Sequence, residues 1–210
     1  MPQTWMITGA NRGIGFALTK VLAARGDHVI AAARDAGSAA LAELTRAHAG
    51  RVTPIALDVT SDASVAAARA ALGARPIDVL VNNAGILRDR MVFNLSEGEW
   101  DAVIAVHLKG TFNCLRHACA HMRQQRYGRI VTFSSGAGLF GNPGQANYGA
   151  AKSAIGGLTK VAARDLGKYG VTVNAICPVA GTRMTVNEEV RRARELRRQQ
   201  GIQREDRGVA

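Results

Sequence analysis

The chain has 210 residues, of which 47% are apolar and 5% aromatic. This length suits a single domain with a sizeable buried core. The uncharged apolar stretches are too short to cross a bilayer, and Met1 leads directly into an apolar run. We therefore expect neither a membrane span nor a leader peptide. The cysteines show no metal-like spacing and cannot all pair internally, which indicates a reducing cytoplasm: Cys114, Cys119 and Cys177.

The net charge is +11, from 27 basic and 16 acidic residues, which raises nucleic acid as a partner. The densest basic cluster lies near the end of the chain, at Arg191, Arg192, Arg194, Arg197 and Arg198. No aromatic residue lies among these arginines, so no base-stacking platform is predicted. We interpret the cluster as a solvated helix face, or as a rim that attracts an anionic substrate or cofactor, ahead of a nucleic-acid interface.

Strand-like and helix-like patterns alternate along the chain. In order, they predict a strand at 5–8, a helix at 13–25, a strand at 28–33, a helix at 38–48, a strand at 52–59, a helix from about 60 to 72, a strand at 78–82, a helical region from 96 to about 125 with or without a break, a strand at 129–134, a helix at 147–169 and a strand at 171–176. Ser96 and Glu99 have the spacing of a capping box. The alternation predicts an α/β fold, a single doubly wound, Rossmann-like parallel sheet with helices on both faces.

A glycine-rich segment from Thr8 to Gly15 follows the first apolar run and opens an amphipathic stretch. A strand, a glycine-rich turn and a helix in that order form a phosphate cradle. Glycines let the backbone approach a pyrophosphate, and the helix N-terminus supplies N–H groups and partial positive charge. The glycines stand at positions 9, 13 and 15, a different spacing from the common dinucleotide fingerprint.

Tyr148 and Lys152 lie four residues apart, which places both on one face of the predicted helix. A nearby cation favours the phenolate and lowers the pKa of a tyrosine, which is normally near ~10, towards a value useful for proton transfer. Ser135 can donate or accept a hydrogen bond at the oxygen that Tyr148 protonates. Such a pair is common in helices by chance, and the upstream glycine-rich turn is what favours a catalytic interpretation.

Together these motifs resemble the short-chain dehydrogenase/reductase family. The matches are Thr-Gly-x-x-x-Gly-Ile-Gly at 8–15, Asn-Asn-Ala-Gly at 82–85, and Ser135 followed by Tyr148-x-x-x-Lys152, over about residues 4–187. The resemblance implies hydride transfer between a nicotinamide cofactor and a carbon that carries oxygen. It makes Tyr148 the proton donor or acceptor, Lys152 its cationic neighbour and a ligand of the nicotinamide ribose, and Ser135 the residue that orients the substrate oxygen.

The resemblance also implies a cofactor site. Its residues are Thr8, Gly9, Asn11, Arg12, Gly13, Ile14, Gly15, Arg34, Asp58, Val59, Asn83, Ala84, Gly85, Tyr148, Lys152, Pro178 and Thr182. Arg34 is the first polar residue after the strand at 28–33, and with Arg12 it predicts NADP, because a cation suits the 2′-phosphate. NAD is the alternative, since Asp35 follows directly and Arg34 could be a surface charge paired with it. No metal is expected.

Three features depart from the usual family pattern. His107 stands where the family has an asparagine that holds a relay water near Lys152, so we expect either a relay role, with a titration near ~6.5, or a packed core histidine. Val179 replaces a glycine after Pro178. A seventh strand is missing from the sequence pattern. We assign 1–187 to the dinucleotide-binding and catalytic domain, and 188–210 to an arginine-rich helical segment and tail of the same domain.

The second half resembles bacterial and peroxisomal 3-hydroxyacyl-CoA dehydrogenases, and the first 80 or so residues resemble small NADP carbonyl reductases. We therefore expect an NADP(H)-dependent oxidoreductase that acts on a small-molecule carbonyl or secondary alcohol, with a 3-oxoacyl or 3-hydroxyacyl thioester as a candidate. The alternative is a catalytically weak cofactor-binding sensor or interaction protein. The resemblance also predicts a homodimer or homotetramer.

Overall fold

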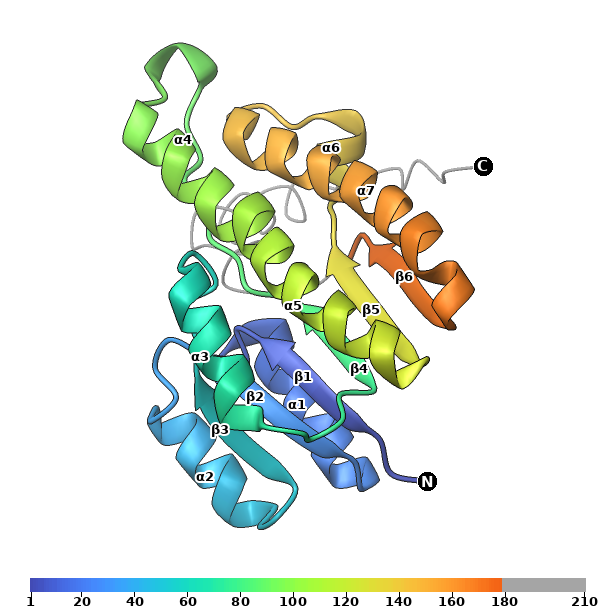
Figure 1. Cartoon of the computed structure of the whole chain (residues 1–210). Helices are drawn as coiled ribbons and strands as arrows, with labels where there is room; N and C mark the ends of the chain where they lie inside the picture. Colours follow the sequence, from blue (N-terminus) through green and yellow to red (C-terminus); the bar gives the residue numbers. More distant parts are fainter. Residues whose placement is uncertain (179–210) are drawn as a thin grey trace, which may run out of the picture. The chain divides into compact units, whose positions relative to one another are not determined.

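The computed structural model describes residues 1–178, and residues 179–210 lie outside that description. Six parallel strands form one sheet in the order β3-β2-β1-β4-β5-β6 (Figure 1). The strands are β1 (Thr4–Thr8), β2 (His28–Ala33), β3 (Val52–Ala56), β4 (Val79–Asn82), β5 (Gly128–Phe133) and β6 (Val171–Ile176). The strand order reverses between β1 and β4, which confirms the predicted doubly wound sheet.

Helices cover both faces of this sheet (Figure 1). They are α1 (Gly13–Arg25), α2 (Ala39–Ala47), α3 (Asp62–Leu72), α4 (Glu97–Ile104), α5 (Gly110–Gln125), α6 (Gly136–Phe140) and α7 (Ala146–Leu166). Neighbouring residues of a strand point to opposite faces. Met6 accordingly packs in the core cluster with residues of α3, α5 and α7, whereas Ile7 packs in the cluster with residues of α1 and α2.

The helical region predicted at 96–125 is three segments in succession. α4 and α5 are joined by η2 (Ala105–Lys109), a π-helical turn. The predicted capping box is present at the start, where the Ser96 N–H donates to the Glu99 carboxylate at 3.0 Å and the Ser96 hydroxyl accepts from the Glu99 N–H. Single π turns inside helices are often found at functional sites. His107 lies in this turn and is almost fully buried.

Two other segments differ from the sequence prediction. β3 ends at Ala56 rather than at residue 59, because Asp58 forms a turn in which its Oδ1 accepts from the Thr60 N–H at 2.9 Å and the Thr60 hydroxyl at 2.7 Å. α6 occupies residues 136–140, where no element was predicted. The remaining short elements are the 3₁₀ turns η1 (Val92–Asn94) and η3 (Gly167–Tyr169).

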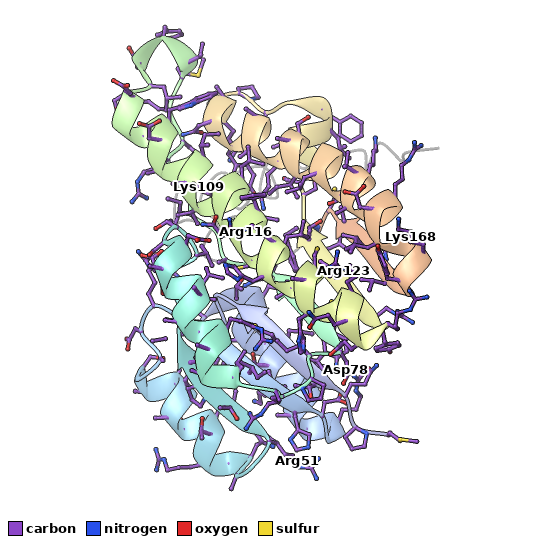
Figure 2. All side chains as sticks on the ribbon, viewed as in Figure 1. Arg51, Asp78, Lys109, Arg116, Arg123 and Lys168 are labelled. Atoms are coloured by element: carbon purple, nitrogen blue, oxygen red, sulfur yellow. The ribbon has the colours of Figure 1, made fainter. Side chains whose placement is uncertain are left out.

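Basic side chains are distributed over several elements of the described part of the chain. Lys109, Arg116 and Arg123 follow one another along η2 and α5, while Arg51 lies in the turn before β3 and Lys168 lies in η3 (Figure 2). Arg116 is paired with Asp62 of α3 at 2.6 Å. The arginine cluster at 191–198, which raised the nucleic-acid interpretation, lies outside the described residues.

Several predictions concern residues that the structure does not describe. They are the missing seventh strand, the boundary between residues 187 and 188, the path of the chain at Val179, and Thr182. Across residues 1–178, every helix falls short of the combined length and apolarity that crossing a membrane requires.

Candidate active site

The predicted site residues converge at the carboxyl ends of β1 and β4, where the strand order reverses. Thr8 ends β1, and its hydroxyl oxygen accepts hydrogen bonds from the N–H groups of Asn83 and Ala84, both at 3.0 Å. The Asn83 amide donates back to the Thr8 carbonyl oxygen at 2.9 Å. These bonds join the glycine-rich turn to the Asn-Asn-Ala-Gly segment. Crevices at such reversal points are where doubly wound sheets bind ligands.

The glycine-rich turn has the backbone features that a pyrophosphate requires. α1 has no side-chain cap and no acidic residue in its first turn, so its leading N–H groups are left to an anion. A Cβ on Gly15 would lie 2.4 Å from the Gly9 carbonyl oxygen, so only glycine lets α1 pack this closely on β1. Gly13 has a φ of +57° and faces open space. The turn therefore fits the phosphates of a dinucleotide.

Charged residues follow β2 and β3 at the same carboxyl edge of the sheet. Arg34 and Arg12 are both exposed. The pKa of Asp58 is lowered, chiefly by its hydrogen bonds from Thr60 and to a smaller extent by the charge of Arg34. No ion pair joins Arg34 to Asp35 in the described part of the chain, which removes the main support for Arg34 as a paired surface charge. Arg34 is thus available to a phosphate.

A buried amide that the sequence reasoning missed holds the loop after β3. Asn113 of α5 donates to the Val59 carbonyl oxygen at 2.9 Å, and both residues are buried. Gly110 lies one helical turn earlier, and a Cβ there would approach the Val59 side chain to 2.7 Å. The sequence does contain a signal for this contact, namely an amide three residues after a glycine on the same face of a helix.

Tyr148, Lys152 and Ser135 are brought together as predicted. The Lys152 side chain is 4% exposed, its Nζ donates to the Phe133 carbonyl oxygen at 2.6 Å, and it lies 5.4 Å from the centroid of the Tyr148 ring. Ser135 caps α6 by accepting from the Ala137 N–H at 3.2 Å. The neighbouring Ser134 is turned away, because its hydroxyl donates to the Lys152 carbonyl oxygen at 2.9 Å. Of the two serines, Ser135 therefore remains available to a substrate.

The predicted lowering of the Tyr148 pKa was wrong. The pKa of Tyr148 is raised rather than lowered, mainly because burial disfavours the phenolate; hydrogen bonding with Ser135 acts in the opposite direction. Burial also lowers the pKa of Lys152 to about 8. The sequence shows the two groups on one helix face, but it does not show that both are withdrawn from water. Tyr148 is therefore protonated at neutral pH.

His107 is a packed, neutral histidine. Its Nε2 lies 2.7 Å from the Ile86 carbonyl oxygen, and its ring meets the Tyr148 ring edge-on with centroids 5.1 Å apart. Burial, with a contribution from the charge of Lys152, lowers the pKa of His107 to about 3, so the expected titration near ~6.5 is wrong. Its Nδ1 is buried and has no hydrogen-bond partner among residues 1–178. A Cβ on Gly85 would lie 2.5 Å from the imidazole, which explains glycine there.

Comparison with known proteins decides the family. A family model described as short chain dehydrogenase matches residues 3–194. The chain belongs to the short-chain dehydrogenase family. The predicted resemblance is therefore confirmed, and two solved short-chain dehydrogenases share the fold. That from Mycobacterium avium has 45% identity and a TM-score of 0.80, covering 88% of this chain and 70% of its own. That from Streptomyces avermitilis has 32% identity and a TM-score of 0.82, covering 87% and 67%.

Curated relatives within the short-chain dehydrogenases include proteins named for acyl thioesters. Hydroxyacyl-CoA dehydrogenase ChsB1 of Mycobacterium tuberculosis is 44% identical, over 87% of this chain and 62% of that protein. The 3-oxoacyl-(acyl-carrier-protein) reductase FabG of Staphylococcus aureus is 44% identical, over 85% of this chain and 74% of FabG. The chain thus spans less than two thirds of the length of ChsB1.

Four predicted cofactor positions of this short-chain dehydrogenase remain. Asn11 and Ile14 are half-buried within the glycine-rich turn, and Pro178 is exposed just after β6. Thr182 lies outside the described residues. Besides Asn113, sequence reasoning missed Asn147, a fully buried amide directly before Tyr148. A polar residue directly before Tyr148 was the only signal for it.

Proposed function

We propose that the protein is an oxidoreductase that transfers a hydride between NADP(H) and a carbonyl or secondary-alcohol carbon, with 3-oxoacyl or 3-hydroxyacyl thioesters as the favoured substrates. The observation that carries this proposal is the buried Lys152 amine, 5.4 Å from the centre of the Tyr148 ring, at the same carboxyl edge of the sheet as a glycine-rich turn that fits a dinucleotide. The relatives named for hydroxyacyl-CoA and 3-oxoacyl substrates support the substrate class.

The residues supply the proton chemistry of such a reaction. When bound, the nicotinamide cofactor supplies or accepts the hydride. In the direction of reduction, the protonated Tyr148 hydroxyl donates its proton to the substrate oxygen, and Ser135 orients that oxygen by hydrogen bonding. Lys152, with a pKa of about 8, is poised to stabilise the resulting phenolate and to help return its proton. His107 contributes its ring, which packs edge-on against Tyr148 and is held by Ile86 through Nε2.

The direct test follows NADPH absorbance with acetoacetyl-CoA and with a panel of simple ketones and quinones. We expect turnover of acetoacetyl-CoA by the wild-type protein. The Tyr148→Phe variant should lose about 10²–10⁴-fold in turnover while it still binds NADPH, because only the acid–base group is removed. Ser134→Ala is the matched control, since Ser134 bonds to the Lys152 backbone and not to the substrate position. Wild-type-like turnover by Tyr148→Phe would contradict the assignment.

The preference for NADP rests on Arg34 and Arg12. A charge-assisted hydrogen bond to phosphate is worth roughly 1.5–3 kcal/mol, or about ten- to a hundredfold in affinity. We therefore expect Arg34→Asp to raise the KM for NADPH by about that factor and to leave the KM for NADH unchanged or lower. Arg164→Asp, an exposed position on α7, is the charge-matched control. Equal Michaelis constants for the two cofactors in the wild-type protein would remove Arg34 from the site.

A second candidate is a cofactor-binding protein without useful turnover. The raised pKa of Tyr148 favours it, because the phenolate that oxidation of an alcohol requires is disfavoured. Tight NADPH binding by calorimetry, with no turnover across the substrate panel in either direction, would support this candidate over the first.

We also propose a cytoplasmic homodimer or homotetramer. The three cysteines are free, which suits a reducing compartment. Phe112 of α5 and Val161 of α7 are 46% and 58% exposed, as residues of a subunit interface would be in a single chain. Light scattering with size-exclusion chromatography would measure the subunit number, and a monomer at micromolar concentration would contradict the proposal.

A further inference from the structure

Asn147 is a fully buried amide, and the chemistry described above makes no use of it. The residue is 0% exposed. Its Nδ2 donates to the carbonyl oxygens of Arg88 at 3.0 Å and Glu99 at 3.2 Å, and its Oδ1 accepts from the N–H of Tyr148 at 2.7 Å. Both donors of the amide and its oxygen are therefore engaged. One side chain joins the loop after β4, the first turn of α4 and the first turn of α7.

The loop that Asn147 holds runs alongside Tyr148. At its start, the Ile86 carbonyl oxygen contacts His107, whose ring lies edge-on against the Tyr148 ring. Further along, Asp89 accepts from the amide of Gln145, three residues before Tyr148, at 2.9 Å, and its charge contributes to the raised pKa of Tyr148. The segment from Ile86 to Asp89 thus borders the catalytic phenol, and the hydrogen bond from Asn147 to Arg88 fixes where the segment lies.

The other side-chain contacts at this junction are exposed. Arg90 pairs with Glu99 at 2.9 Å, and the Gln145 amide donates to Asp89 at 2.9 Å. Exposed ion pairs contribute little because water and salt screen them. A buried amide matters more, because its removal deprives the Arg88 carbonyl oxygen and the Tyr148 N–H of these partners. Asn147 is therefore the buried side-chain support of the junction, beside a backbone hydrogen bond from the Arg90 N–H to the Gly144 carbonyl oxygen at 2.7 Å.

The position of Tyr148 makes that support relevant to the reaction. Tyr148 lies in the first turn of α7, where backbone N–H groups have no partner within the helix and where helices open most easily. Asn147 satisfies the N–H of Tyr148 itself. A displacement of about 1 Å at a reacting group can lower the rate by about 10²-fold.

We propose that Asn147 is a positioning residue, whose amide holds the Tyr148 phenol at a set place between the 86–89 segment and α4. The inference rests on the proposed function. It predicts different effects on kcat and on the affinity for the cofactor. The cofactor turn is built by β1 and α1, so loss of the amide should reduce kcat and leave the affinity for NADPH nearly unchanged.

The test compares Asn147→Asp and Asn147→Ala with Asn142→Ala, which removes an exposed amide from the same segment. Asn147→Asp keeps the shape and the acceptor, loses the donors to Arg88 and Glu99, and when ionised adds a negative charge beside those two carbonyl oxygens. We expect kcat with acetoacetyl-CoA to fall by about 10- to 100-fold in both Asn147 variants, with the KM for NADPH within about twofold of wild type. Hydrogen exchange in peptides that cover 86–90 and 97–104 should become faster. Asn142→Ala should resemble the wild-type protein.

The outcomes separate this inference from the proposed function. A folded Asn147→Asp protein with kcat within about twofold of wild type overturns the inference. So does a parallel loss of kcat, NADPH affinity and melting temperature, which would indicate packing alone. If Asn147→Ala does not fold, Asn147→Asp decides. If the wild-type protein shows no turnover, the proposed function fails, and unchanged exchange over 86–90 in Asn147→Asp then overturns the positioning role as well.

Discussion

Lys152 is the residue whose environment most differs from what its position in the sequence indicates. Lysines seldom lie 4% exposed. Here one backbone carbonyl accepts from the ammonium group, and the Tyr148 ring lies beside it. Burial lowers the pKa of Lys152 from 10.5 to about 8, so the folded protein holds this proton less tightly than the unfolded chain does. Burial of this amine thereby reduces the free energy of unfolding at neutral pH.

This environment predicts a pH dependence of folding. Between pH 8 and 10.5 the unfolded chain binds more protons at Lys152 than the folded protein, so the free energy of unfolding rises with pH in that window. The rise is on the order of 3 kcal/mol, at about 1.36 kcal/mol per pKa unit. Below pH 8 both states are protonated and the contribution is constant. Urea titrations of the Lys152→Met variant should lack this rise.

The control for that measurement is Lys160→Met, which changes an exposed lysine of the same helix and should keep the wild-type slope. The difference between the wild-type and Lys152→Met curves isolates Lys152 from the other titrating groups. Parallel curves from pH 8 to 10 would show that Lys152 is not buried as described.

At the scale of elements, the most informative packing is that of the π turn η2 against the loop after β4. His107 projects from η2 to fill the space beside Gly85, where a Cβ would come within 2.5 Å of the ring. The same ring contacts Tyr148 of α7. Three elements that are distant in the sequence are therefore packed around one imidazole.

The Gly85→Ala variant should be destabilised for this reason. The added methyl group must displace the imidazole, and overpacking of this kind typically costs about 1–3 kcal/mol. Turnover should fall as well, because the displaced ring presses on Tyr148. The double variant Gly85→Ala with His107→Ala should recover part of the lost stability, as a double-mutant cycle would measure.

The control is Gly157→Ala, at an exposed glycine of α7 with open space around it, which should be neutral or stabilising. Additive effects of the two site changes would contradict the contact.

Much of the element order could be predicted from the sequence, for physical reasons. The strand at 28–33 is a continuous apolar run, as a strand buried on both faces requires, and Ser96 with Glu99 marks a helix start by chemistry that is local. α6 has only five residues, too few to show a period. The site residues came from motifs, but the pKa of Tyr148 did not follow from them. It depends on burial by segments distant in the chain, which spacing along one helix does not reveal.

For the whole molecule, the central feature is the junction between the two halves of the sheet. β1 and β4 lie side by side, and the hydroxyl of Thr8 and the amide of Asn83 join their ends. The glycine-rich turn belongs to the first half, whereas Ser135, Tyr148 and Lys152 belong to the second. A dinucleotide that contacts both would favour the folded state of the entire sheet.

We therefore expect NADPH to raise the melting temperature. Binding at 100 times the dissociation constant contributes about 2.7 kcal/mol, which corresponds to a shift of roughly 5–10 °C for a chain of this size. Gly13→Asp should largely abolish the shift, because its carboxylate would face the phosphates. Gly13→Asn is the matched control, with the same backbone cost at a φ of +57° but no charge. Equal shifts in the two variants would place the phosphates elsewhere.

The π turn at Ala105–Lys109 also sets how α4 and α5 face their surroundings. Each residue of a helix turns it by about 100°. If residues 105–109 were wound as regular α turns instead, everything after them would be rotated by about a quarter of a circle relative to α4. Asn113 could not then reach the Val59 carbonyl while Val103 kept its place in the interior. The wider turn takes up one extra residue, so that α4 and α5 keep the relative orientation that both contacts require.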